Sequence, residues 1–128
     1  MNFQTQSTLP ISQPESILKE MNEWLTETLG DSAEFMIPEL AEMFLEDAPS
    51  LVQMIQYALS QNDVVQVRNA AHTLKGSSAS MGLHIFSKHC KEIETQAKTG
   101  NLAAAAKQFP QFEAEYMQVV SALQTIVE

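Results

Sequence analysis

Apolar residues recur along this chain at steps of three and four, which is the spacing of one face of an α-helix. The clearest case lies between residues 64 and 81, where the spacing is an unbroken 3-4-3-4-3. That stripe consists of Val64, Val67, Ala71, Leu74, Ser78 and Met81. No segment shows the sustained alternation of apolar and polar residues that is typical of a β-strand. The pattern therefore predicts an all-α protein.

Four further stripes predict a short first helix and three longer ones. They are Ile17, Met21, Trp24 and Leu25; then Ile37, Leu40, Phe44, Ala48, Leu51, Ile55 and Leu59; then Leu83, Phe86, Cys90, Ile93 and Ala97; and last Leu102, Ala105, Phe109, Phe112, Tyr116, Val119, Leu123 and Ile126. Long amphipathic helices joined by short turns are typical of helix bundles. We therefore expect an antiparallel four-helix bundle with an additional short N-terminal helix.

Capping and turn residues separate these stripes. Ser12-Gln13-Pro14-Glu15 has the form of a capping box, with a capping residue followed three positions later by Glu. Asp31-Ser32-Ala33-Glu34 has the same pattern before the second helix. Single glycines follow three of the stripes, at Gly30, Gly82 and Gly100. Pro49 and Pro110 lie inside their helical patterns, so we expect a kink or a brief interruption at Pro49 and a kink near Pro110.

The 128 residues suit one domain that is large enough for a real core. Residues 1–11 are rich in Gln, Ser and Thr and lack periodicity, so we expect a flexible N-terminal arm there and a single domain over residues 12–128. The first residues lack the layout of a secretory signal, and no apolar run approaches the length of a membrane span. We therefore expect a cytoplasmic protein.

The formal net charge is −9, with only seven Lys and Arg residues. This balance argues against nucleic-acid binding and against adhesion to an anionic membrane surface. A single cysteine, Cys90, excludes an intramolecular disulfide and a cysteine-based metal site. It lies on an apolar stripe, so we expect a buried hydrophobic residue. His84 and His89 are five residues apart, which does not place them on one helix face as a metal-binding pair.

His72 lies roughly 130° from the centre of the stripe over residues 64–81 and should face solvent. Its neighbours on that face are Arg68, Lys75, Gly76 and Ala79. Val65 is an exposed apolar residue on the same surface, and together with Arg68 and Ala79 it suits a docking patch for another protein.

The residues of this face suit the handling of a phosphoryl group. A histidine with an ordinary pKa near 6.5 is largely neutral at cytoplasmic pH, so one ring nitrogen has a lone pair that can attack phosphorus. Lys75 and Arg68 would neutralise the negative charge. Gly76 destabilises a helix interior by about 1 kcal/mol relative to alanine, but it would let another protein's backbone approach closely. The alternative is a surface histidine beside a tightly packed glycine.

The wider sequence resembles the histidine-containing phosphotransfer (HPt) family. The resemblance covers roughly residues 34–126 and is carried by Ala71-His72-Thr73-Leu74-Lys75-Gly76-Ser77-Ser78, by Gly82, Cys90, Ile93-Glu94 and Gly100, and by Phe44-Leu45-Glu46-Asp47-Ala48-Pro49. It implies a bundle with His72 exposed and phosphorylated through its outer ring nitrogen. Lys75 would stabilise the phosphoryl group, and Gly76 would give clearance to the partner.

The resemblance also implies partners. These would be receiver domains of a hybrid sensor kinase, of a response regulator, or of both, and they would supply the acceptor aspartate and magnesium. We expect no cofactor on this chain, which would be a phosphorelay intermediate rather than an enzyme with its own ATP site. Two alternatives stay open. In the dimerisation and phosphoacceptor module of a sensor kinase, an acidic residue usually follows the histidine, whereas here Thr73 does. In a non-catalytic helical adaptor, His72 would be incidental.

Overall fold

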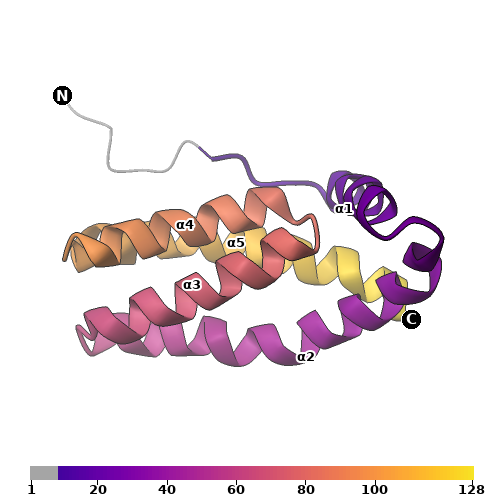
Figure 1. Ribbon diagram of the computed structural model, residues 1–128. Coiled ribbons are helices and arrows are strands. Elements are labelled where there is room, and N and C mark those ends of the chain that lie inside the picture. The colour runs from indigo at the N-terminus through magenta and orange to yellow at the C-terminus, as the bar shows by residue number, and fades with distance from the viewer. Residues whose placement is uncertain (1–8) are drawn as a thin grey trace.

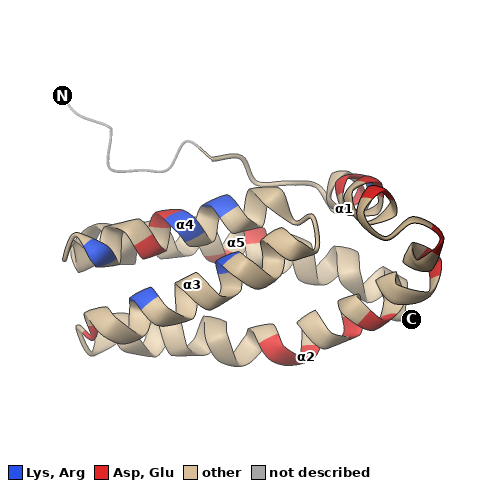
Figure 2. Ribbon diagram, in the orientation of Figure 1, with Lys and Arg blue, Asp and Glu red and all other residues tan. Residues whose placement is uncertain are grey.

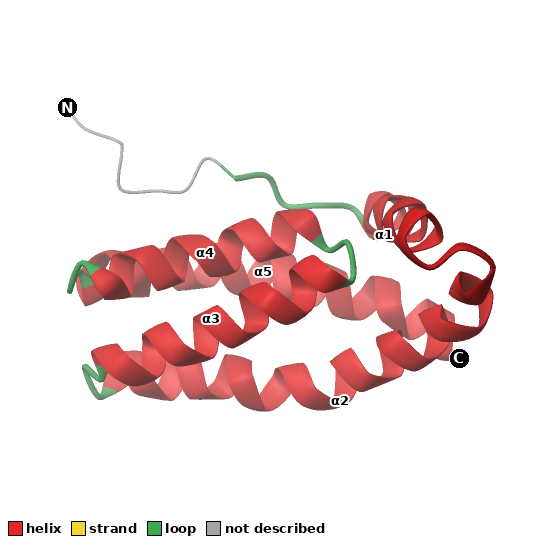
Figure 3. Cartoon of the chain, viewed as in Figure 1, coloured by secondary structure: helices red, strands yellow, loops and turns green. Residues whose placement is uncertain are grey.

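The computed structural model describes residues 9–128, and every regular element in this part of the chain is a helix. The elements are α1 (Pro14–Leu29), the short 3-10 helix η1 (Gly30–Ser32), α2 (Ala33–Ser60), α3 (Val64–Ser80), α4 (His84–Lys98) and α5 (Leu102–Val127). Figure 1 shows α2 to α5 as an up-and-down bundle, with α1 across one end. Figure 3 shows the short turns that join the long helices. The predicted fold class is confirmed. Residues 1–8 of the expected arm lie outside the described residues.

The predicted stripes supply the core. Val67, Ala71, Leu74 and Ser78 of α3 are buried, and the stripes of the other four helices point into the same cluster. Aromatic rings join the helices near its middle. Phe86 lies 5.3 Å from Phe112 and 5.9 Å from Tyr116, measured between ring centroids, and 6.2 Å from Phe44. Because this packing draws on α2, α4 and α5, it fixes which face of α4 points into the core.

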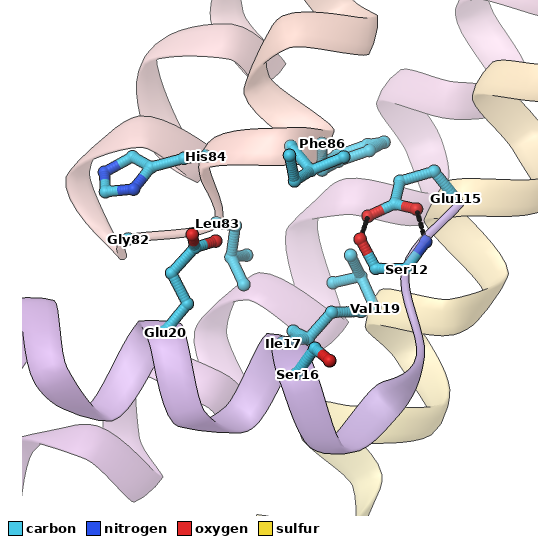
Figure 4. A pocket seen from close by; sticks show the side chains of 11 residues that line it. Ser12, Ser16, Ile17, Glu20, Gly82, Leu83, His84, Phe86, Glu115 and Val119 are labelled. Carbon is cyan, nitrogen blue, oxygen red and sulfur yellow. Dashed lines mark hydrogen bonds between the residues drawn. The ribbon is translucent and has the colours of Figure 1, made fainter. Parts of the chain in front are cut away.

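The predicted capping box at Ser12 is wrong. The helix α1 begins at Pro14 without a side-chain cap. Ser12 turns instead to Glu115 of α5, and its backbone N–H and its hydroxyl donate to the two carboxylate oxygens at 2.6 and 2.7 Å. Glu115 is almost fully buried, so a missing partner there would be more unfavourable than a missing cap. Figure 4 shows this pair beside a cavity of about 100 Å³ beneath α1.

The expected cap at Asp31 is wrong, and of the two alternatives expected at Pro49 the interruption is absent. Asp31 does not cap α2, because η1 carries the chain from α1 into Ala33 without a side-chain hydrogen bond at Ser32. The helix α2 also continues through Pro49, and α5 continues through Pro110. Packing on both sides holds a long helix together although proline removes one backbone hydrogen bond. Figure 1 shows α2 changing direction along its length, without a break.

Gly82 forms the turn between α3 and α4, where it packs against α1. Its φ of 79° lies in the left-handed region, and a Cβ there would come within 2.7 Å of the Trp24 side chain. The Trp24 indole N–H donates to the Ser80 carbonyl at 3.4 Å, and its ring meets His84 edge-on, with the centroids 4.9 Å apart. This contact places α1 over the end of the bundle. None of the described helices is long and apolar enough to cross a membrane.

Candidate functional site

His72 projects from the outer face of α3, where the helical register places it. Its side chain is 67% exposed. Leu74 and Ala71, on either side of it in the sequence, point into the core, so α3 cannot rotate without exposing them. The backbone at the site is also tied to α4, because the Ser87 hydroxyl donates to the Lys75 carbonyl at 3.1 Å. His72 is therefore a solvent-facing group on a fixed support.

Glu94 of α4 reaches the site from the neighbouring helix. Its side chain is only 5% exposed, and one carboxylate oxygen lies 2.8 Å from His72 Nδ1. The other oxygen accepts a hydrogen bond from Lys75 Nζ at 2.6 Å. Lys98, one turn along α4, lies 4.0 Å from the first oxygen. A single carboxylate thus joins the histidine and the lysine that the sequence places one turn apart.

The protonation of this group follows from its surroundings. Burial favours the neutral form of Glu94, but the hydrogen bonds from Lys75 and His72 outweigh it and lower the pKa of the carboxyl group. Glu94 is therefore ionised at neutral pH and can only accept hydrogen bonds. Nδ1 of His72 is therefore the donor in this hydrogen bond, and in the neutral form of the ring the free lone pair lies on Nε2. Nε2 is thus the ring nitrogen that is available to act as a nucleophile.

Gly76 leaves open space one turn beyond His72. A Cβ built at this position has no heavy atom of the described chain within 4 Å, apart from the helix's own nearby backbone. Internal packing therefore does not require a glycine here, in contrast to Gly82. The missing side chain keeps the surface beside His72 low, as close approach by another molecule demands.

The remaining predicted residues lie around this centre. Val65 is 53% exposed, whereas Arg68 and Ala79 are half-buried on the same helix. Val65, Arg68, His72, Gly76 and Ala79 all belong to the outward side of α3, because they fall between the buried positions of that helix. These residues share one side of α3, and the hydrogen bonds to Glu94 link His72 with Lys75.

The sequence reasoning missed Glu94 as a member of the site. A signal was present, because Glu94 falls on the apolar stripe of α4, between Cys90 and Ala97. A carboxylate at a buried helix position needs a charged or hydrogen-bonding partner. Its partners stand on α3, however, and a stripe within one helix does not show which residues of another helix it meets.

The other histidines and the cysteine lie elsewhere. His84 is half-buried against Trp24. His89 is fully buried, and its Nε2 lies 3.0 Å from the Pro10 carbonyl oxygen. Cys90 is buried as expected, and burial raises the pKa of its thiol. Within residues 9–128 no group of three or more His, Cys, Asp or Glu side chains is arranged to hold a metal ion.

Comparison with known proteins agrees with this geometry. The family model described as "Hpt domain" matches residues 39–122. The phosphorelay protein LuxU of Vibrio vulnificus is 32% identical over 77 residues, and the sensor protein TorS of Escherichia coli K12 is 35% identical over 72 residues. These alignments cover 60% and 53% of this chain, but only 64% of LuxU and 8% of TorS.

A solved structure shares the fold. The histidine-containing phosphotransfer protein B (HptB) of Pseudomonas aeruginosa PAO1 superposes with a TM-score of 0.70 at 28% sequence identity. The superposition covers 82% of this chain and 88% of that one. Because the family model spans well over half of the sequence and contains the entire His72 site, the chain belongs to the Hpt domain family.

Proposed function

We infer that this chain is a histidine phosphotransfer protein of a multistep phosphorelay, and that His72 is its phosphorylated residue. The observation that carries this inference is the hydrogen bond between His72 Nδ1 and the buried carboxylate of Glu94. It places the lone pair of the neutral ring on Nε2, and the side chain is 67% exposed, so another protein can dock there and deliver the phosphoryl group. Membership of the Hpt domain family supports the same function.

The transfer step balances with the groups present. The Nε2 lone pair of His72 attacks the phosphorus of an aspartyl phosphate on a receiver domain. The N–P bond forms as the P–O bond breaks, and the electron pair leaves with the aspartate carboxylate. The ring keeps its Nδ1 proton and becomes positively charged. Glu94, 2.8 Å away, stabilises that charge, and the reverse step passes the group to the next receiver aspartate.

Lys75 and Gly76 have distinct roles in this proposal. Lys75 is held 2.6 Å from Glu94 in the free protein and can turn its ammonium group toward the phosphoryl oxygens. Gly76 gives the receiver domain clearance. Val65, Arg68 and Ala79 would contact its surface. We expect the magnesium and the reacting aspartate on the receiver, in a hybrid sensor kinase or a response regulator, and we place the chain in the cytoplasm as a relay intermediate.

The two alternatives explain less of the site. A sensor-kinase phosphoacceptor module would use an acidic neighbour of the histidine, but Thr73 stands there and its hydroxyl donates to the Asn69 carbonyl. A non-catalytic adaptor gives no reason for an ionised carboxylate that is buried between His72 and Lys75.

The test is transfer of radiolabel. Receiver domains from the same organism are phosphorylated with labelled acetyl phosphate, purified and mixed with this chain. We expect label on the chain that is acid-labile and base-stable, and none on His72→Gln. If His72→Gln takes up label like the wild type, the assignment of His72 is wrong. If label comes from ATP with no partner present, the kinase alternative is correct.

A further inference from the structure

The basic residues of this acidic chain are concentrated on two helices. Five of its seven Lys and Arg residues lie on α3 and α4, and we call them the α3–α4 basic face. They are Arg68, Lys75, Lys88, Lys91 and Lys98. Figure 2 shows the blue segments of α3 and α4 on neighbouring helices, and these are the two helices that the contact between His72 and Glu94 joins. The other two, Lys19 and Lys107, belong to α1 and α5.

The acidic residues have the opposite distribution. Ten of the sixteen Asp and Glu residues fall between residues 15 and 47, on α1, η1 and the first half of α2. Figure 2 shows this part of the molecule marked in red, at the end that α1 covers. Positive and negative charge are therefore concentrated in different parts of the molecule. The resulting electric field would orient a charged surface as it approaches.

Three of the five residues of the basic face have no ion-pair partner among residues 9–128. Arg68, Lys88 and Lys91 form no ion pair with any residue that the structure describes, and Lys88 and Lys91 are exposed. Lys98 reaches Glu94 only at 4.0 Å. Glu94 is already shared between His72 and Lys75, so it does not neutralise the surrounding lysines. Lys91 precedes Glu94 by one helical turn and thus lies on the same edge of α4.

We propose that the α3–α4 basic face is a docking surface for an acidic protein surface, namely that of the receiver domain. In this role Lys88 and Lys91 attract the partner outside the reacting centre. The proposal rests on the proposed function, because the partner must present a phosphorylated carboxylate to His72, and that group is itself an anion. A long polyanion such as nucleic acid, or an anionic membrane, would also meet the acidic α1–α2 end. A compact acidic patch would not.

The experiment compares two double variants with the same change in net charge. Lys88→Glu/Lys91→Glu alters the basic face and leaves all residues bonded to Glu94 in place. Lys19→Glu/Lys107→Glu alters the two exposed lysines elsewhere. The second-order rate constant of transfer from a labelled receiver domain is measured at about 20 mM and about 500 mM salt. Phosphorylation by phosphoramidate, a small donor that needs no docking, is measured in parallel.

We expect Lys88→Glu/Lys91→Glu to slow transfer from the receiver about tenfold at low salt, and this difference to shrink at high salt. The matched variant should remain within about twofold of wild type. Equal slowing by both variants, or slowing by neither, would overturn the proposal. So would salt-sensitive binding of the wild type to phosphatidylglycerol vesicles that Lys88→Glu/Lys91→Glu abolishes, because the face would then recognise lipid headgroups. If phosphoramidate and receiver both fail to phosphorylate the wild type, the proposed function fails instead.

Discussion

The Glu94 carboxylate contacts both His72 and Lys75, although its side chain is only 5% exposed. Ionised carboxylates are seldom buried without partners, and here the partners are His72 and Lys75. The same bond that satisfies the carboxylate selects the ring tautomer of His72. Residues that orient a reactive histidine in this way act through it, without touching phosphorus themselves. Glu94 is thus a positioning residue for the proposed transfer.

The sequence predicts the direction of His72 but not this partner. Exposure of His72 depends only on the register of α3, which the unbroken stripe of that helix defines. The bond to Glu94 depends on which residues of α4 face α3, and that orientation follows from packing of α4 in the whole core, including the contacts of Phe86 with α2 and α5. Nothing within either helix alone contains this information.

The variants Glu94→Gln and Glu94→Leu separate charge from hydrogen bonding. Gln keeps an oxygen that can accept from Nδ1 but loses the negative charge, so we expect transfer to slow about tenfold with the tautomer preserved. Leu removes both and should slow transfer further while the two ring tautomers mix. The rate of label transfer and the ¹⁵N chemical shifts of the His72 ring measure the two effects. A Leu variant with the wild-type rate and ring shifts would contradict the positioning role.

At the scale of elements, the sequence predicts the helices better than their ends. The five helices follow from the stripes because apolar spacing reports directly which face is buried. The caps fail at Ser12 and Asp31, because a capping pattern competes with tertiary partners that lie far away in sequence. Ser12 is drawn to Glu115, 103 residues further on, whose own position on the α5 stripe signals a buried carboxylate that needs donors.

Gly82 and Gly100 offer a matched test of how α1 is held. Both have left-handed backbones, with φ of 79° and 78°, but only Gly82 faces another side chain, that of Trp24. Gly100→Ala should lower the free energy of unfolding by about 1 kcal/mol through backbone strain alone. Gly82→Ala should lower it by about 2 kcal/mol or more, because the new methyl group also displaces Trp24. Urea denaturation measures both, and equal losses would show that the Trp24 contact contributes nothing.

At the scale of the whole molecule, the cavity beneath α1 and the His72 site lie in different places on the bundle. Its cavity beneath α1 is lined by residues such as Ser12, Phe86 and Glu115, and none of the site residues belongs to its walls. The His72 site is instead an outward surface of α3 and α4. In the proposed transfer, another protein would have to exclude water from this surface and bring the second reactant, so the rate would be governed by how closely that protein can approach.

Gly76→Leu tests this dependence on approach. The substitution fills space that is open in the free chain, and leucine favours a helix more than glycine, so we expect an equal or slightly higher free energy of unfolding. Transfer from a receiver domain should slow at least tenfold, because the leucine side chain holds the partner away from Nε2, and a misplacement of about 1 Å can already slow a reaction 100-fold. Phosphorylation of His72 by phosphoramidate should change much less, since that donor is small.

The control for Gly76→Leu is Gln66→Leu, which adds the same side chain to an exposed position of α3 about 120° away from His72 around the helix. It should leave both reactions near the wild-type rate. Equal slowing by the two leucines would mean that any added apolar side chain on α3 disturbs the protein. If the Gly76→Leu protein folds and accepts phosphoryl groups from the receiver at the wild-type rate, clearance is not the reason for a glycine in this helix. The presence of a helix-destabilising glycine at this position would then need another explanation. The receiver domain would then have to approach His72 from the α4 side, over Lys91 and Lys98, rather than along α3.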